Sequence, residues 1–284
     1  MKSYQEMTKA ERRAELAAVK KEYEAIKAKD RSLDMSRGKP NPAQLDFSMA
    51  LLGQSPFELI TTRKGTDVRN YGELAGVDEC KELFADILGL TPANIIMGGQ
   101  SSLNLMYDSI VRALLLGVYG GSQPWGQQGE LKFLCPVPGY DRHFAICQEF
   151  GIQMINIPMD EYGPDMAMIK EYVETDPSVK GIWCVPKYSN PSGITYSDEV
   201  VRAFAALKPA ADDFRIFWDN AYLVHGFRDE DDQLLNIFEA CREFGSEDMV
   251  YEFFSTSKVT FSGAGLAVLA ASENNIKFIL RQMG

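Results

Sequence analysis

Apolar and polar positions near the N-terminus repeat with the spacing of an amphipathic helix. A capping-box pattern of Thr8 and Glu11 indicates where this helix begins. Its apolar face, opposite Lys, Glu and Arg, is formed by Leu16, Val19, Tyr23 and Ile26. We expect this helix to pack against the body of the protein or against a partner subunit.

Beyond residues 33–42, a Gly-, Pro- and Asn-rich segment that is expected to be a loop, strand and helix patterns alternate regularly. Short apolar runs predict strands at 94–97, 131–136, 152–157, 181–185, 215–218, 249–254 and 266–271. Helical spacing predicts helices at 77–88, at 103–114, around 144–147, at 165–173, 197–207 and 234–244, and from 273 onward. This order is typical of an α/β domain with a largely parallel sheet.

Two further segments are expected to be exposed loops. Residues 120–129 are rich in Gly and Gln and include Trp125. Residues 229–232 form an acidic run, which we interpret as solvated.

Composition and charge limit the kinds of binding partner and the cellular compartment that we expect. The 284 residues are 45% hydrophobic and 24% charged, as in ordinary globular proteins. A net charge of -11 argues against non-specific binding to nucleic acid or to an anionic membrane surface. There is no apolar signal core at the N-terminus and no apolar run of transmembrane length, so we expect a soluble, cytoplasmic protein. The five scattered cysteines contain no CxxC pair and are expected to be buried free thiols, and no metal site is predicted.

Polar or aromatic residues follow several of the predicted strands. In parallel sheets, ligands bind beyond the carboxyl ends of the strands. The residues placed at this edge, far apart in sequence, are Tyr140, Asn190, Asp219 and Lys258. Their convergence is stronger evidence for a site than any one of them alone.

Each of these residues has an ordinary structural interpretation and a functional one. Lys258 could be a surface charge, but a lysine that loses solvation can deprotonate and form a Schiff base with an aldehyde. Asp219 could cap a turn, or it could pair with a heteroaromatic nitrogen. Tyr222, three residues later, could reach the same ligand.

The other candidates are equally ambiguous when considered singly. Asn190 could belong to a simple turn or could donate to a phenolic oxygen. Tyr140 could cover the core or stack on a planar cofactor. Residues 98–102, Gly-Gly-Gln-Ser-Ser, join a strand to a helix, where backbone amides can bind an anion.

Together, three ordered motifs resemble the class I/II aminotransferases of fold type I, and more narrowly their bacterial aspartate-aminotransferase-like subgroup. They are Asn190-Pro191, Asp219-x-x-Tyr222 and Ser255-x-Ser257-Lys258. The resemblance covers the chain from about residue 33 to its end. It implies pyridoxal 5'-phosphate as cofactor and a three-layer α/β fold with a mostly parallel sheet.

The resemblance also implies a role for each residue around the cofactor ring. Lys258 would hold the cofactor as a Schiff base and transfer the proton at the substrate α-carbon. Asp219 would pair with the pyridine nitrogen, and His143 would support Asp219. Tyr222 and Asn190 would bond the phenolic oxygen, and Tyr140 would stack on the ring.

The remaining implied contacts concern the phosphate and the substrate. The phosphate would be held by Gly99, Gln100, Ser101, Ser255 and Ser257. Tyr71, five residues before a glycine, would reach the phosphate of the neighbouring subunit, which implies a homodimer. Gly38 and Asn190 would lie beside the substrate.

Two features depart from the family pattern. Leu266 stands where many members have a phosphate-binding arginine, so another group must balance the phosphate charge. The chain also ends in what resembles the interdomain helix, so we expect a truncated chain without the C-terminal small domain. The expected organisation is an N-terminal helix and arm (1–50), a cofactor-binding large domain (51–272) and the start of the interdomain helix (273–284).

The sequence therefore predicts transamination between an amino acid, with aspartate favoured by the resemblance, and a 2-oxo acid. A β-elimination or decarboxylation at the same site stays open as an alternative. So does a catalytically inert fragment, or an interaction module that has kept the fold.

Overall fold

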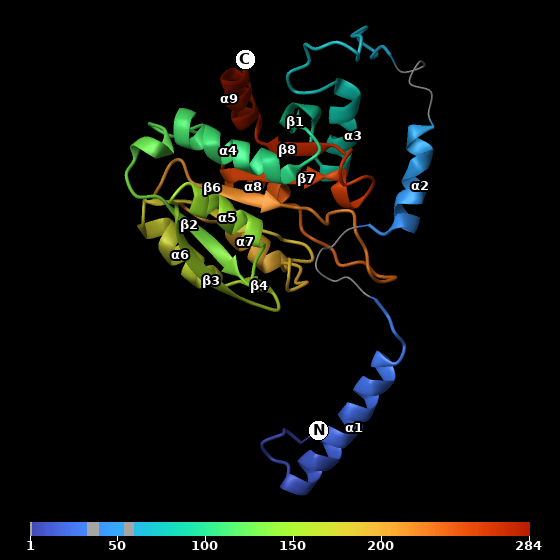
Figure 1. Cartoon of the computed structure of the whole chain (residues 1–284). Helices are drawn as coiled ribbons and strands as arrows, with labels where there is room; N and C mark the ends of the chain where they lie inside the picture. The colour runs from blue at the N-terminus through green and yellow to red at the C-terminus, as the bar shows by residue number, and fades with distance from the viewer. Residues whose placement is uncertain (1, 33–39, 54–59) are drawn as a thin grey trace. The chain divides into compact units, whose positions relative to one another are not determined.

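The computed structural model describes residues 2–32, 40–53 and 60–284, and the chain divides into two compact units, residues 1–39 and 40–284. The first unit contains helix α1 (Lys9–Lys27) (Figure 1). The Thr8 hydroxyl accepts from the Glu11 amide at 3.2 Å, and the Glu11 carboxylate accepts from the Thr8 amide at 2.7 Å. The predicted capping box is therefore confirmed.

A mixed sheet forms the centre of the second unit (Figure 1). Its eight strands in the described residues are β1 (Ile95–Met97), β2 (Lys132–Val137), β3 (Gln153–Asp160), β4 (Gly163–Pro164), β5 (Val179–Cys184), β6 (Arg215–Asp219), β7 (Val250–Ser255) and β8 (Ala267–Ala271). The spatial order is β1-β8-β7-β6-β5-β2-β3-β4. The central pairs from β7 to β3 are parallel, whereas β1–β8, β8–β7 and β3–β4 are antiparallel.

Helices cover both faces of this sheet, which confirms the predicted three-layer α/β class. One core cluster contains side chains of α3 (Asp78–Leu88), α6 (Met166–Thr175), α7 (Asp198–Ala205) and α8 (Ile237–Phe244). The other contains side chains of α4 (Ser102–Leu116), α5 (Asp141–Glu149) and α9 (Glu273–Met283). A further helix, α2, spans Pro42–Leu52.

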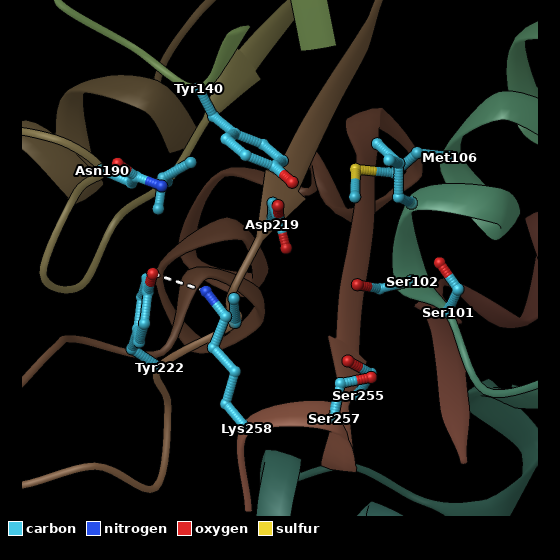
Figure 2. Close-up of a pocket in the computed structure, with 13 residues that line it drawn as sticks. Ser101, Ser102, Met106, Tyr140, Asn190, Asp219, Tyr222, Ser255, Ser257 and Lys258 are labelled. Carbon is cyan, nitrogen blue, oxygen red and sulfur yellow. Dashed lines mark hydrogen bonds between the residues drawn. The ribbon is translucent and has the colours of Figure 1, made fainter. Parts of the chain in front are cut away.

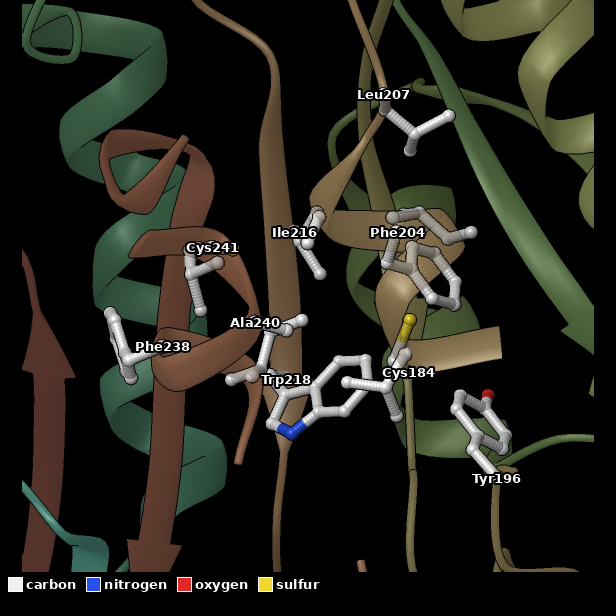
Figure 3. Close-up of a cluster of buried hydrophobic side chains, with 14 of the residues drawn as sticks. Cys184, Tyr196, Phe204, Leu207, Ile216, Trp218, Phe238, Ala240 and Cys241 are labelled. Atoms are coloured by element: carbon white, nitrogen blue, oxygen red, sulfur yellow. The ribbon is translucent and has the colours of Figure 1, made fainter. Parts of the chain in front are cut away.

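Successive side chains of β6 pack into the two core clusters in turn. Ile216 and Trp218 point into the α7–α8 cluster, part of which is drawn in Figure 3, while Phe217 belongs to the α4–α5 cluster. Successive side chains of a strand point to opposite faces, so Asp219 at the end of β6 shares the face of Phe217. This register places a carboxylate at the sheet edge on the α4–α5 side.

Several local expectations need correction. Trp125 is fully buried in a short 3-10 helix (Trp125–Gln127), so its segment is not simply an exposed loop. Helix α2 and strand β4 were not predicted. Residues 33–39 of the expected loop lie outside the described residues, and Pro42 already begins α2, after Asn41 has capped it.

Two further expectations concern the state of the cysteines and the presence of a membrane-spanning helix. All five cysteines are free; four are buried as expected, but Cys80 is only half-buried. Among the described helices, none combines the length and the apolar character needed to cross a bilayer.

Candidate active site

A pocket of about 190 Å³ opens at the carboxyl ends of β5, β6 and β7, beside the first turn of α4 (Figure 2). Eight residues singled out from the sequence line it: Ser101, Tyr140, Asn190, Asp219, Tyr222, Ser255, Ser257 and Lys258. The sheet brings them together because they lie at the carboxyl ends of β5, β6 and β7 or at the starts of α4 and α5. The structure thus brings these eight residues together at one edge of the sheet.

Asp219 forms the buried floor of the pocket. It is 4% exposed, and its Oδ2 lies 3.0 Å from Nε2 of His143 on α5, which is 1% exposed. The imidazole is stacked on the indole of Trp183, with ring centroids 4.6 Å apart. Asp219 Oδ1 is also buried but has no hydrogen-bond partner within the described part of the chain. One carboxylate oxygen is therefore oriented by the protein, and the other is available to a donor in the pocket.

Lys258 faces this floor from the short 3-10 turn that follows β7 (Thr256–Lys258). Its Nζ donates to the Tyr222 hydroxyl at 2.5 Å and lies 4.0 Å from the centre of that ring. The ring Nε2 of His225 lies 3.2 Å from the Lys258 carbonyl oxygen, an acceptor. The segment after β6 thus contacts Lys258 through both its amine and its backbone.

Tyr140 and Asn190 also contribute to the pocket wall. Tyr140 precedes α5, and burial, together with the nearby Asp219 carboxylate, raises the pKa of its hydroxyl. Asn190 lies in the loop between β5 and α7, where the Ser189 amide donates to the Ile194 carbonyl at 2.8 Å. A planar ligand bound here would meet an aromatic face and an amide.

Hydroxyls and free helix amides gather where α4 begins. Ser101 caps α4 by accepting from the Asn104 amide at 3.3 Å. Ser255 ends β7, and the Ser257 hydroxyl donates to the Gln100 carbonyl at 2.9 Å. The start of a 15-residue helix with hydroxyls around it is a favourable place for an anion.

Some predicted phosphate contacts are adjacent to the pocket rather than in its wall. Gly99 and Gln100 do not line it; the Gly99 carbonyl accepts from Ala267 in the sheet at 2.7 Å. Leu266 is 41% exposed, and its amide donates to the Thr256 hydroxyl at 3.0 Å. Lys258 is the one cationic side chain in the pocket wall among the described residues.

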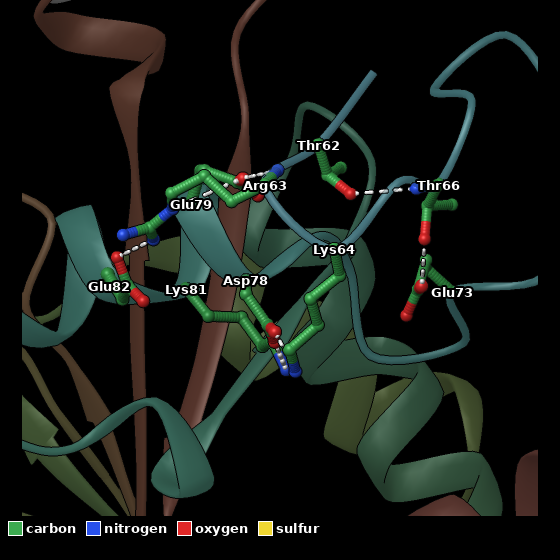
Figure 4. Close-up of polar contacts among 9 residues, drawn as sticks. All are labelled: Thr62, Arg63, Lys64, Thr66, Glu73, Asp78, Glu79, Lys81 and Glu82. Atoms are coloured by element: carbon green, nitrogen blue, oxygen red, sulfur yellow. Dashed lines mark hydrogen bonds and ion pairs between the residues drawn. The ribbon is translucent and has the colours of Figure 1, made fainter.

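Tyr71 lies away from the pocket, with 97% of its surface exposed. The chain on its N-terminal side is fixed to α3 by ion pairs (Figure 4). Arg63 contacts Glu79 and Glu82, and Lys64 contacts Asp78. The role of Tyr71 at a subunit interface stays a prediction. Gly38 lies outside the described residues.

Hydrogen bonds from Lys64 and Lys81 lower the pKa of the Asp78 carboxyl to about 2. Asp78 therefore stays ionised throughout the physiological pH range and keeps this anchor in place.

Some residues of the pocket wall, and the aromatic residue behind His143, were not predicted from the sequence. Ser102, Leu103 and Met106 also line the pocket, and their spacing on the first turns of α4 could have indicated a shared face. Trp183, which positions His143 from below, looked like an ordinary strand residue. No local signal distinguishes it from other buried aromatics.

Comparison with known proteins identifies the family. The sequence model of the family described as aspartate amino-transferase matches residues 7–284. The chain belongs to this family. The expected resemblance to this family is thereby confirmed.

Individual relatives agree with this assignment. A Mycolicibacterium smegmatis protein with a provisional aminotransferase name is 43% identical over 99% of this chain and 66% of its own length. The aspartate aminotransferase of Corynebacterium glutamicum is 41% identical over 94% of this chain and 61% of its own length. A crystal structure of an aspartate transaminase from C. glutamicum has a TM-score of 0.87 at 40% identity, covering 97% of this chain and 65% of that chain. The chain thus spans about two thirds or less of the length of these relatives.

Proposed function

We propose that the chain carries the pyridoxal-phosphate site of an aminotransferase that moves an amino group from an aspartate-like amino acid to a 2-oxo acid. The observation that supports this most directly is that Asp219 and Lys258 line the same pocket. A buried carboxylate with a free oxygen suits a protonated ring nitrogen, and a lysine amine suits an aldehyde.

The side chains of the pocket fit the remaining groups of this cofactor. Tyr140 offers an aromatic face to the ring, and Tyr222 and Asn190 offer donors to its phenolic oxygen. Ser101, Ser255 and Ser257 would bond the phosphate together with the free amides of α4. When bound, the cofactor supplies an electron sink for the bonds at the substrate α-carbon.

Asp219 would keep the ring nitrogen protonated, because a buried negative charge favours a nearby positive one. His143 would hold the Asp219 carboxylate in place through Oδ2, leaving Oδ1 for the cofactor. This division of the two oxygens explains why a buried imidazole is placed behind a buried carboxylate.

Lys258 would anchor the cofactor and then, as a neutral amine, take the proton from the substrate α-carbon. Tyr222 contacts the amine at 2.5 Å and so defines where Nζ rests. Pocket hydroxyls and amides would balance the phosphate, since Leu266 provides no charge. A homodimer with Tyr71 at the subunit interface forms part of the same proposal and is supported by the family resemblance. A cytoplasmic location is also proposed, on the evidence of the free cysteines.

The first test is the visible absorbance of the chain with added pyridoxal phosphate. We expect a band that is lost in Lys258→Ala and retained in Lys277→Ala, an exposed lysine on α9. If no band forms, or if it persists without Lys258, the proposed site is wrong.

A second test addresses the reaction. We expect aspartate to discharge the band and release an oxo acid without ammonia. Release of ammonia or carbon dioxide instead would indicate elimination or decarboxylation, and an unchanged spectrum with every amino acid would contradict amino-group transfer by this chain.

A further inference from the structure

An ion pair between a buried lysine and a partly exposed aspartate lies beside the segments that form two walls of the pocket, outside the residues assigned to the cofactor. Lys187, only 4% exposed, follows β5, and its Nζ donates to the Asp231 carboxylate at 2.9 Å. The other oxygen of Asp231 accepts from the Tyr188 hydroxyl at 2.5 Å. We call Lys187, Tyr188 and Asp231 the loop clamp. The acidic run was expected to be solvated, but Asp231 is bound in this cluster.

The clamp joins the two segments that carry Asn190 and Tyr222. Lys187 and Tyr188 lie two to three residues before Asn190. Lys187 Nζ also donates to the carbonyl of Leu223 at 3.2 Å, directly after Tyr222. One ammonium group therefore touches both the acidic loop and the backbone next to Tyr222.

Packing around the clamp shows that this loop conformation is closely fitted. A Cβ atom at Gly226 would lie 3.1 Å from the Asp231 carboxyl carbon, so glycine allows the carboxylate to approach the backbone. The Tyr188 ring packs against Phe227 with ring centroids 4.7 Å apart. Hydrogen bonds from Tyr188 and Lys187 lower the pKa of Asp231, which keeps the acceptor ionised.

Burying the Lys187 ammonium group contributes little net stability. Removing an ammonium group from water costs free energy, and its attraction to one carboxylate barely offsets that cost. An ion pair does provide a fixed geometry. Here it fixes the distance between two loops that each present one hydrogen-bond donor to the same place in the pocket.

We infer that the loop clamp is a positioning device, which aligns Asn190 and Tyr222 with each other and thereby sets the proton affinity of the bound cofactor. This inference rests on the proposed function. Two aligned donors to the phenolic oxygen stabilise its deprotonated form, so their misalignment raises the pH at which the bound cofactor loses its proton.

The test compares Asp231→Asn with Asp229→Asn, the same substitution two residues away on an exposed side chain. Each variant is loaded with pyridoxal phosphate, and the visible band is followed against pH. We expect the midpoint to rise by about 0.4 to 1 pH unit in Asp231→Asn, the equivalent of one weakened hydrogen bond, and to stay unchanged in Asp229→Asn. The dissociation constant for the cofactor should rise roughly 2- to 10-fold in Asp231→Asn alone.

Tyr188→Phe provides a milder change if Asp231→Asn does not fold, because it removes one hydroxyl and leaves the ion pair. It should shift the midpoint in the same direction by a smaller amount. Equal midpoints in Asp231→Asn, Tyr188→Phe and Asp229→Asn would overturn the inference, even if the thermal stability of the first two is lowered.

Hydrogen exchange of the cofactor-free chain separates this inference from the proposed function. We expect faster amide exchange at residues 222–226 and 188–192 in Asp231→Asn than in Asp229→Asn. If the unmodified chain binds no cofactor, the proposed function fails. Unchanged exchange in Asp231→Asn would refute the clamp whether or not cofactor binds.

Discussion

We expect Glu252 to make the folding stability of the chain depend on pH. It lies within β7 and is 4% exposed, and it lines a second cavity together with Trp218 and Asn220. The one hydrogen bond of its carboxyl group in the described residues comes from the Asn220 amide, which donates to Oε1 at 2.8 Å. Burial raises the pKa of Glu252 from an ordinary 4.5 to about 7, against a smaller lowering by Asn220.

The sign of the effect follows from where the proton is held. Between pH 4.5 and 7 the folded chain keeps the proton on Glu252 while the unfolded chain has lost it. Folding stability therefore falls as the pH rises through this window. Each pH unit corresponds to about 1.4 kcal/mol, so the loss attributable to this one group is about 3 kcal/mol above the window.

Glu252→Gln removes this dependence and keeps the shape of the side chain. The new carbonyl can still accept from the Asn220 amide. The new amide can also donate to Asn220 Oδ1, which is buried without a partner in the described residues. The free energy of unfolding of the wild type should fall by about 2 to 3 kcal/mol relative to the variant between pH 5 and pH 8.

Urea unfolding curves at several pH values, followed by tryptophan fluorescence, measure this difference directly. Trp218 lies beside the cavity and reports its opening. Glu149→Gln, an exposed position at the end of α5, is the matched control and should run parallel to the wild type at every pH. A constant gap between the wild type and Glu252→Gln across the pH range would refute the reasoning.

Two other substitutions test the packing of the sheet. Lys180→Met should cost about 3 to 5 kcal/mol in urea unfolding, because it leaves the buried Asp213 carboxylate, 2.7 Å from Lys180, without its cation; a cost below about 1 kcal/mol would contradict this. Gly181→Ala should lower stability by about 1 to 3 kcal/mol, because its Cβ would lie 2.4 Å from the Phe133 ring. Adding Phe133→Leu should recover part of that loss, and no recovery would exclude the clash as the cause.

Most of the strands and many residues of the pocket wall could be predicted because their signals are local. The runs that become β2, β5, β6 and β7 are apolar enough to be recognised singly. A parallel sheet then brings the residues after them to one edge, which is why Asp219 and Lys258 could be placed together. The antiparallel pairing of β8 could not be predicted, since it depends on how the chain returns to the sheet rather than on its composition.

Other features depend on contacts between distant segments. The Gly- and Gln-rich surroundings of Trp125 suggested exposure, whereas its ring packs against Phe133, with centroids 5.8 Å apart. Asp231 belongs to a run of acidic residues, and only the spatial neighbour Lys187 distinguishes it from the others. The exposed loop with Tyr71 gives no internal evidence of what it contacts.

The stacking of His143 on Trp183 connects a side chain of the hydrophobic core to Asp219 in the pocket. Trp183 also contacts Phe133 and Phe217 and donates to the Cys147 sulfur at 3.2 Å. Under the proposed function, selection for catalysis would act on Trp183, although this indole touches no ligand. Tolerance to substitution should therefore be lower in the α4–α5 core layer, beneath His143, than in the opposite layer, where equally buried side chains have no such connection to Asp219.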